Sequence, residues 1–299
     1  MRLLVAAVAL LALCGCSAES PPLEVHPGVW RAWLDSPGGE LPFGLELTRG
    51  GEQWGAVVIN GPERLDIPRV TVAGVNLTLD IEHYAAPGEA TLDSSGRLAG
   101  RWWKTGKEGA ISELPFHAIR GESLRFTPLP AAGKPTDIVG RWRVRFAGEE
   151  DDAIAEFARG AGATAITGTF LTTTGDYRFL AGSFEGRRLR LSVFDGAHAF
   201  LFDAELQEDG TLAGDFWSRE SWHDTWTATR DDDATLDAAT EQVAWVGGIP
   251  LSEIAYPDLD GELRTLDDPK FAGEVRILEV FGSWCPNCND ATSYLVELH

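Results

Sequence analysis

Apolar and polar residues alternate with a period of two in several short runs along the chain. Residues 77–81 (LTLDI) and 189–193 (LRLSV) are the clearest examples. This pattern is typical of half-buried antiparallel strands. Ser95-Gly96 and Asp209-Gly210 lie between such runs, where hairpin turns require positive φ. The pattern therefore predicts short strands joined by tight turns.

The alternating runs belong to an internal duplication. Residues 90–104 (ATLDSSGRLAGRWWK) and 204–218 (AELQEDGTLAGDFWS) are identical at seven of fifteen positions. The pairs Gly28-Val29-Trp30-Arg31 with Gly140-Arg141-Trp142-Arg143, and Ala118-Ile119-Arg120 with Ala228-Thr229-Arg230, extend the match to both ends. A repeat of this length corresponds to a small domain rather than a solenoid unit. We expect a mainly β fold of two repeated small antiparallel barrel or sandwich modules, each with about seven or eight strands.

Tryptophans recur at matching positions of the duplication. Trp30 corresponds to Trp142, and Trp103 corresponds to Trp217. Exposed Trp could grip a partner or ligand, but large aromatic residues at repeated positions more often fill a core. We therefore expect these four residues to be structural.

Composition limits the classes of function. The chain has 299 residues with 44% hydrophobic content, enough for about two folded domains. Asp and Glu number 46 against 25 Lys and Arg, which gives a net charge of −21. No basic run offsets this surplus, so binding of nucleic acid through its phosphates is excluded.

The four cysteines lie in two pairs at the ends of the chain, and the first pair belongs to a targeting segment. Residues 3–13 form an apolar run that follows Arg2. As a helix this run would reach about 16 Å, too short for a bilayer core of about 30 Å. It therefore predicts a secretory signal. Residues 13–17 (LCGCS) resemble a bacterial lipobox with Cys16 as the lipidated residue, although an ordinary cleaved signal remains an alternative.

The lipobox implies a location. A chain acylated at Cys16 would be anchored in the cell envelope by its N-terminal lipid and face the periplasm. The next residue is Ser17 rather than Asp, which by resemblance to Gram-negative lipoproteins favours the outer membrane.

The second pair follows an apolar run. Residues 275–281 (VRILEVF) predict a buried strand. Gly282-Ser283 and the motif Trp284-Cys285-Pro286-Asn287-Cys288 come next, and residues 290–298 are compatible with a helix. A C-x-x-C at a helix N-terminus is a redox motif, because the helix dipole and free N–H groups favour a thiolate. We expect Cys285 to be the nucleophile and Cys288 to close a disulfide with it.

Residues 278–288 resemble the first βα unit of the TlpA-like thiol:disulfide oxidoreductases, a family with the thioredoxin fold. Residues 257–261, 266 and 271–273 resemble the hairpin that precedes this strand in that family, and the tandem β region resembles the N-terminal extensions of some members. The resemblance implies an envelope disulfide reductase with a disulfide-bearing protein substrate, an upstream thiol electron donor and no cofactor or metal. Cys285 would attack the substrate disulfide and Cys288 would release the reduced substrate. Trp284, Pro286 and Asn287 would shape the motif.

Glu279 is the third predicted catalytic residue. It stands six residues before Cys285, where thioredoxins keep a buried carboxylate. Burial in the apolar run 275–281 would raise its pKa and suit it to accept the proton of Cys288. The alternative is an edge strand from which Glu279 points to solvent.

The C-terminal region departs from the family in length. Only 51 residues run from Ile249 to His299, so the later strands, the outer helices and the cis-Pro loop have no counterpart. Because the sequence stops within the predicted helix, we expect a fragment of a longer protein.

These observations predict the following organisation: a lipoprotein signal peptide at 1–15, a tether at 16–26, β modules at 27–128 and 137–232, a linker at 233–248 containing a helical connector, and the incomplete start of an α/β thioredoxin-like domain at 249–299. Two other functions remain open. One is a non-enzymatic lipoprotein that binds a ligand or partner protein through its β modules, and the other is a peroxiredoxin-like peroxidase.

Overall fold

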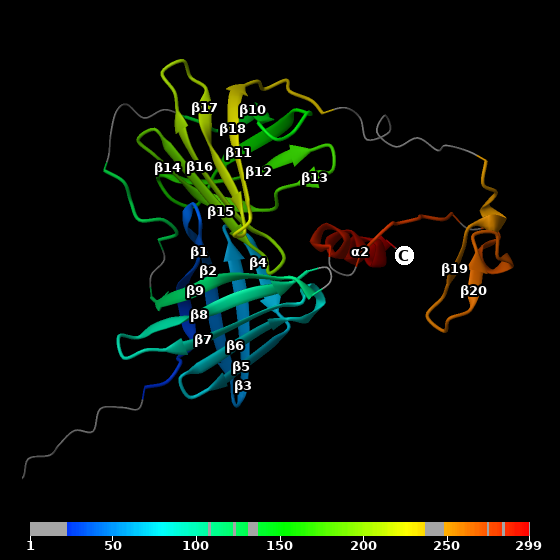
Figure 1. Ribbon diagram of the computed structural model, residues 1–299, viewed down its shortest axis with the longest axis horizontal. Helices are drawn as coiled ribbons and strands as arrows, with labels where there is room; N and C mark the ends of the chain where they lie inside the picture. Colours follow the sequence, from blue (N-terminus) through cyan, green and yellow to red (C-terminus); the bar gives the residue numbers. More distant parts are fainter. Residues whose placement is uncertain are drawn as a thin grey trace, which may run out of the picture.

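The computed structural model describes residues 23–106, 109–121, 124–130, 137–236, 248–273, 275–282 and 285–298. Figure 1 shows two β-barrels packed end to end, with a short helix beside their junction and a small hairpin set apart from them. The first barrel spans residues 28–120 and the second spans residues 140–230. The predicted signal peptide with Cys16, and residues 237–247 of the predicted connector, lie outside the described residues.

The first barrel is a nine-stranded antiparallel meander. Its strands are β1 (Gly28–Ser36), β2 (Gly39–Gly50), β3 (Gln53–Asn60), β4 (Glu63–Ile67), β5 (Arg69–Ala73), β6 (Asn76–Ile81), β7 (Ala86–Leu92), β8 (Arg97–Thr105) and β9 (Ile111–Arg120), and the 3-10 helix η1 (Glu82–Tyr84) joins β6 to β7. The first and last strands pair, with Trp30 opposite Arg120. β4 and β5 are the two ends of the sheet order.

The second barrel repeats this meander with nine strands. They are β10 (Gly140–Phe146), β11 (Ala153–Arg159), β12 (Ala165–Thr172), β13 (Gly175–Asp176), β14 (Leu180–Glu185), β15 (Arg188–Phe194), β16 (Ala199–Leu206), β17 (Leu212–Ser218) and β18 (Trp222–Arg230). Trp142 lies opposite Arg230, in the same register as Trp30 and Arg120. Here β12 pairs with both β11 and β14, so this barrel is closed by hydrogen bonds all round. Each copy has more strands than the seven or eight predicted.

The repeated glycines have a steric role. A Cβ atom at Gly100 would lie 1.9 Å from the Glu89 carbonyl oxygen, and one at Gly214 would lie 2.1 Å from that of Asp203. Only glycine allows the neighbouring strand to approach this closely. The shared Leu-Ala-Gly sequence therefore marks the same close strand contact in both barrels.

The repeated tryptophans at the barrel starts are core residues, as predicted. Trp30 and Trp142 are each 2% exposed. The indole Nε1 of each donates to a carbonyl four residues earlier, to His26 at 3.3 Å and to Ile138 at 2.9 Å. Trp103 and Trp217 are only half-buried, and Trp217 packs against the core of the first barrel.

The two barrels share part of one core. Phe194, Ala197, Ala199 and Leu201 of the second barrel are buried in the same cluster as the core of the first. The ring of Phe194 lies 4.5 Å from that of Phe43 and meets Trp102 edge-on at 5.3 Å. The β15–β16 turn therefore closes one end of the first barrel.

The C-terminal residues do not form the start of a thioredoxin-like domain. They contain the 3-10 helices η3 (Leu251–Glu253) and η4 (Pro269–Phe271), the hairpin of β19 (Ala255–Pro257) and β20 (Leu263–Thr265), and the helix α2 (Pro286–Leu298). Residues 275–281, predicted as a buried strand, are not in a strand and are exposed. The fold is mainly β with one short helix, and the predicted α/β part is corrected accordingly. The physical reason is that an extended apolar segment becomes a strand only against partner strands, and the described residues around it provide none.

Candidate functional site

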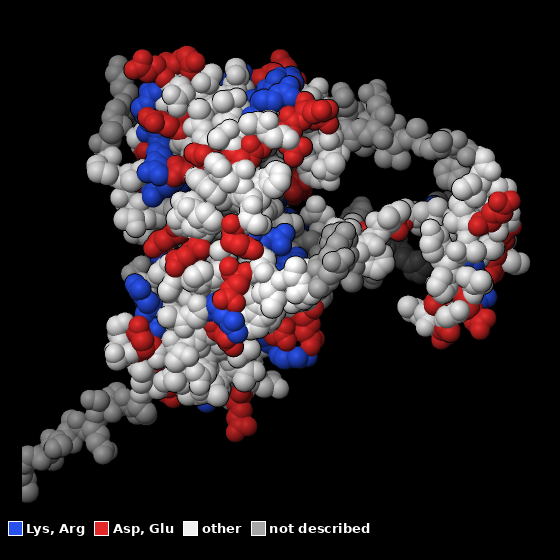
Figure 2. All heavy atoms as spheres, viewed as in Figure 1, with Lys and Arg blue, Asp and Glu red and all other residues white. Residues whose placement is uncertain are grey.

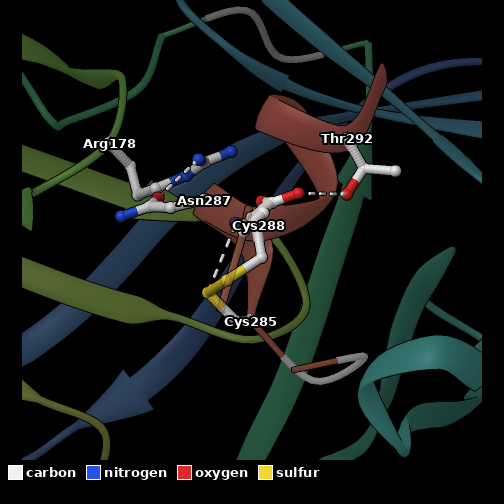
Figure 3. Close-up of a disulfide and its surroundings, with 6 residues drawn as sticks. Arg178, Cys285, Asn287, Cys288 and Thr292 are labelled. Carbon is white, nitrogen blue, oxygen red and sulfur yellow. Dashed lines mark hydrogen bonds between the residues drawn. A yellow bond between two sulfur atoms is a disulfide. The ribbon is translucent and has the colours of Figure 1, made fainter. Parts of the chain in front are cut away.

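The cysteine motif lies at the start of α2. Cys285 immediately precedes the helix, Pro286 is its first residue, and Cys288 lies in its first turn. A disulfide joins Cys285 to Cys288, and their Cα atoms are 5.2 Å apart (Figure 3). The backbone N–H of Cys288 also points at Cys285 Sγ, at 3.2 Å. Trp284 lies outside the described residues.

Glu279 does not occupy the position predicted for a catalytic carboxylate. It is exposed, in an extended segment whose neighbours Val280 and Leu278 are 100% and 65% exposed. Its Oε2 accepts a hydrogen bond from Thr292 Oγ1 at 3.5 Å. The predicted burial of Glu279 in a strand is therefore wrong.

The family assignment and the enzymatic function are corrected for the same reason. A thioredoxin-like site needs the cysteine motif at the edge of a central sheet with a carboxylate behind it. In the described part of the chain the motif is followed by one helix and preceded by exposed, extended residues. The prediction of a TlpA-like disulfide reductase is therefore wrong, and the peroxidase alternative, which needs the same kind of domain, fails with it.

The motif does contact the second barrel. Arg178 Nη1 donates to Asn287 Oδ1 at 3.0 Å, and Figure 3 shows the two side chains pointing toward each other. Arg178 itself has a positive φ of 63°, a conformation that is uncommon for residues other than glycine. Asp176 supports this turn, because its Oδ1 accepts from the Arg178 N–H at 2.8 Å.

Arg178 is also the centre of a buried cluster of charges between the barrels. Its Nε lies 3.1 Å from Asp195 Oδ2, and its Nη2 lies 3.4 Å from Glu63 Oε1. The three side chains are 7% exposed or less. His198 Nδ1 lies 2.9 Å from Asp195 Oδ2. Buried charges persist only when they are paired, and here the partners come from both barrels.

The pKa of Asp195 reflects this environment. Burial alone would raise it, but the hydrogen bonds from His198 and the positive charge of Arg178 outweigh burial and hold the pKa of the carboxyl below its ordinary value. Asp195 is therefore ionised at neutral pH, and its charge is compensated inside the protein.

Asn60 extends the cluster to the segment that follows the first barrel. This residue is fully buried. Its Nδ2 donates to Glu63 Oε2 at 3.0 Å and to the Phe194 carbonyl at 2.8 Å, and its Oδ1 accepts from Arg125 Nη2 at 3.0 Å. One amide therefore joins the first barrel, the second barrel and the connecting segment.

Arg125 is buried between the barrels and bonds to neutral oxygens. Besides Asn60, it donates to the Ile59 carbonyl and to both Oγ and the carbonyl oxygen of Ser192. Burial lowers its pKa to about 9, and the negative charge of Glu63 partly opposes this effect. The guanidinium therefore remains protonated at neutral pH and brings positive charge to the junction.

An open groove of about 700 Å³ lies beside this junction. This inter-barrel groove is lined by residues 29–31, 43–44, 59, 61–62, 124–126, 159–167, 181–183 and 185. It thus takes its walls from both barrels and from the segment between them. Its volume is within the range of about 300–1,000 Å³ that is typical of ligand pockets.

Two other hollows are present. The cavity inside the first barrel, lined by Phe43, Trp102 and Phe194 among others, measures about 20 Å³, close to the space that one water occupies. A shallower cleft of about 640 Å³ lies on the second barrel near Arg141, Thr169 and Phe179.

Within the described residues there is no cluster of three or more metal-binding side chains. No helix among the described residues has the length and apolar character needed to cross a membrane.

Sequence reasoning did not find the residues of the groove or of the buried cluster. Asn60, Arg125 and Arg178 stand at unrelated positions in the two copies, so the repeat gives no signal for them. The only local signal is Asp195-Gly196 with His198 at the end of an apolar run, where a carboxylate beside a buried strand needs a partner.

No protein-family model matches the sequence, and no curated protein matches it. Among solved structures, the chain is similar to a crystal structure described as a "putative outer membrane protein" from Bacteroides fragilis. The identity is 8%, the match covers 68% of this chain and 97% of that chain, and the TM-score is 0.23. A likeness this weak carries no argument about the function of the present protein.

Proposed function

We propose that the protein is a non-enzymatic binding protein of the cell envelope, in which the two β-barrels hold a small ligand in the inter-barrel groove. The observation that carries this proposal is the groove itself, which is open, of ligand size and walled by both barrels. The N-terminal lipobox supports the location, with Cys16 as the lipid anchor.

The junction is built to keep the groove in one shape. Phe194 fixes one barrel against the other through Phe43, and Asn60 ties both to the connecting segment. A groove held by a shared core and buried hydrogen bonds loses little freedom when a ligand binds, which favours affinity.

A thermal-shift screen with a groove-filled variant tests the proposal. The panel consists of straight-chain fatty acids and alcohols, hexapeptides with free or amidated C-termini, and disaccharides. Ala163→Trp fills the groove from an exposed turn of the second barrel, and Ala147→Trp makes the same change in an exposed turn away from it. A ligand at about 100 times its Kd stabilises a protein by about 2.7 kcal/mol.

We expect at least one class of compound to raise the melting temperature of the wild type and of Ala147→Trp but not of Ala163→Trp. If no compound stabilises the protein, or if Ala163→Trp responds as the wild type does, the groove is not the binding site and the proposal fails.

A further inference from the structure

The inter-barrel groove contains a buried hydroxyl that has no hydrogen-bond partner among the residues that the structure describes. Ser183 on β14 is 8% exposed and lines the groove. Within the described residues its Oγ has no hydrogen-bond partner. An unpaired buried hydroxyl costs about 1–3 kcal/mol. Because this hydroxyl lies in the wall of an open groove, a bound ligand could supply the atom that accepts its hydrogen bond.

Arg190 provides a second donor next to Ser183 that has no partner in the described part of the chain. The β14–β15 ladder places Arg190 directly opposite Ser183, so their side chains share one face of the sheet. Arg190 is mostly buried, and its Nε has no hydrogen-bond partner among the described residues. Its Nη2 is held by the Thr127 carbonyl at 2.8 Å and by Glu185.

The charges around this face favour an anion. Ser192 is two residues along β15 from Arg190 and therefore lies diagonally from Ser183, at about 7–8 Å by strand geometry. The Oγ of Ser192 accepts a hydrogen bond from Arg125 Nε at 2.9 Å. Within the described part of the chain, the hydrogen bonds of Arg125 go to neutral oxygens, so its charge is not cancelled by a direct ion pair.

The acidic residue in the groove wall does not oppose an anion strongly. Glu185 accepts from the Leu129 N–H at 2.7 Å, from Thr164 Oγ1 at 3.2 Å and from Arg190 Nη2 at 3.2 Å. The negative charge of Glu185 is therefore already paired with Arg190, and both of its carboxylate oxygens accept hydrogen bonds. Among the described residues, the Ser183 O–H and the Arg190 Nε–H thus remain as donors for a ligand, and Arg125 adds positive charge.

Much of the rest of the wall is apolar or small, beside the polar residues Arg31, Arg159, Thr164 and Thr167. Leu124, Phe126 and Ile166 lie in it, and Phe126 packs under the Arg190 guanidinium at 4.9 Å. Gly160, Ala161, Gly162 and Ala163 form one rim. Such a surface suits a hydrocarbon chain, and the groove is much larger than a carboxylate alone requires.

We propose that the inter-barrel groove binds a carboxylate with an apolar tail. The inference rests on the proposed binding function and names its ligand class. Ser183 and Arg190 donate to the carboxylate, Arg125 supplies additional positive charge, and the wall around Phe126 and Ile166 contacts the tail.

Titration calorimetry with three probes tests the inference: dodecanoate below its micelle concentration, dodecanol and inorganic phosphate. We expect the wild type to bind dodecanoate at least tenfold more tightly than dodecanol and not to bind phosphate measurably. Ser183→Ala should weaken dodecanoate binding about tenfold and leave the affinity for dodecanol unchanged. The control, Ser218→Ala, makes the same change in β17 outside the groove.

Each of the contrary results overturns a different part of the inference. Equal affinity for dodecanol and dodecanoate would overturn recognition of the carboxylate, and equal affinity for phosphate would overturn the role of the tail. If dodecanoate does not bind while another compound in the thermal-shift panel still discriminates Ala163→Trp from Ala147→Trp, this inference fails and the proposed function stands. Free-acid hexapeptides in the same titration separate a peptide carboxylate from a fatty acid as its source. A circular-dichroism melting curve confirms that Ser183→Ala is folded.

Discussion

The ring of Phe194, from the second barrel, lies 4.5 Å from the ring of Phe43 in the first. Phe194 also lines the small cavity inside the first barrel. It is the last residue of β15, which also carries Arg190 and Ser192. One strand therefore carries both a residue that joins the barrels and Arg190, which lies opposite Ser183 of the groove wall.

Replacing Phe194 should lower the stability of the first barrel as well as that of the junction. Phe194→Ala removes a buried ring and enlarges an existing cavity, for which we expect a loss of about 3–5 kcal/mol in the free energy of unfolding. Urea denaturation measures this loss. Phe179→Ala, at a residue that is 51% exposed, is the control and should change stability by less than about 1 kcal/mol. Similar losses for both variants would show that Phe194 does not join the barrels.

The repeated tryptophans give a prediction that compares the two barrels directly. Trp142→Phe keeps most of the buried ring but leaves the buried Ile138 carbonyl without its donor. We expect a loss of about 1–3 kcal/mol, and a smaller loss for Trp30→Phe because its hydrogen bond is longer, at 3.3 Å, and only partly buried. Trp222→Phe, at an exposed position of β18, should have almost no effect. Urea unfolding of the three variants checks this, and a larger loss for Trp30→Phe than for Trp142→Phe would contradict it.

The contact between Arg178 and Asn287 should hold the first turn of α2 against the second barrel. Asn287→Ala removes the acceptor of a charged hydrogen bond, and such bonds contribute about 1.5–3 kcal/mol. We expect hydrogen exchange of the amides in the first turn of α2 to become about tenfold faster or more. Glu297→Gln, near the other end of the helix, is the matched control. Unchanged exchange in Asn287→Ala would mean that the contact does not position the helix.

The sequence predicts the β modules well because their signals are local. Alternation with a period of two marks the strands, and the repeated Gly100 and Gly214 mark positions where a strand passes too close for a side chain. The recurrence of Trp30 and Trp142 at the same position of each copy predicts that both are buried. The strand count was too low because short strands such as β13 (Gly175–Asp176) carry no alternation.

The prediction at the C-terminus failed because a strand is not a local property. Residues 275–281 have the composition of a buried strand, yet Val275 and Val280 are 95% and 100% exposed. The site at the junction is missed for a related reason. Asn60 and Phe194 are 134 residues apart in sequence and meet only because the barrels pack end to end, and no pattern in either copy encodes that arrangement.

Asp195 gives the buried cluster a characteristic dependence on pH. Because its folded pKa lies below the ordinary value, its ionised form stabilises the protein above about pH 4, and this contribution is lost as pH falls through the folded pKa. Below about pH 4 the wild type should therefore lose stability more steeply than Asp195→Asn, by up to about 1.4 kcal/mol per pH unit. Urea unfolding between about pH 7 and pH 2.5 measures this difference.

Asn60→Ala is the matched control for that experiment. It breaks the same cluster but removes no titratable group, so the free energy by which it destabilises the protein should not follow the titration of Asp195. We expect the gap in stability between the wild type and Asp195→Asn to be constant from about pH 7 to about pH 4 and then to narrow. A gap that stayed constant down to about pH 2.5 would show that the ionised Asp195 carboxylate does not stabilise the junction between the barrels.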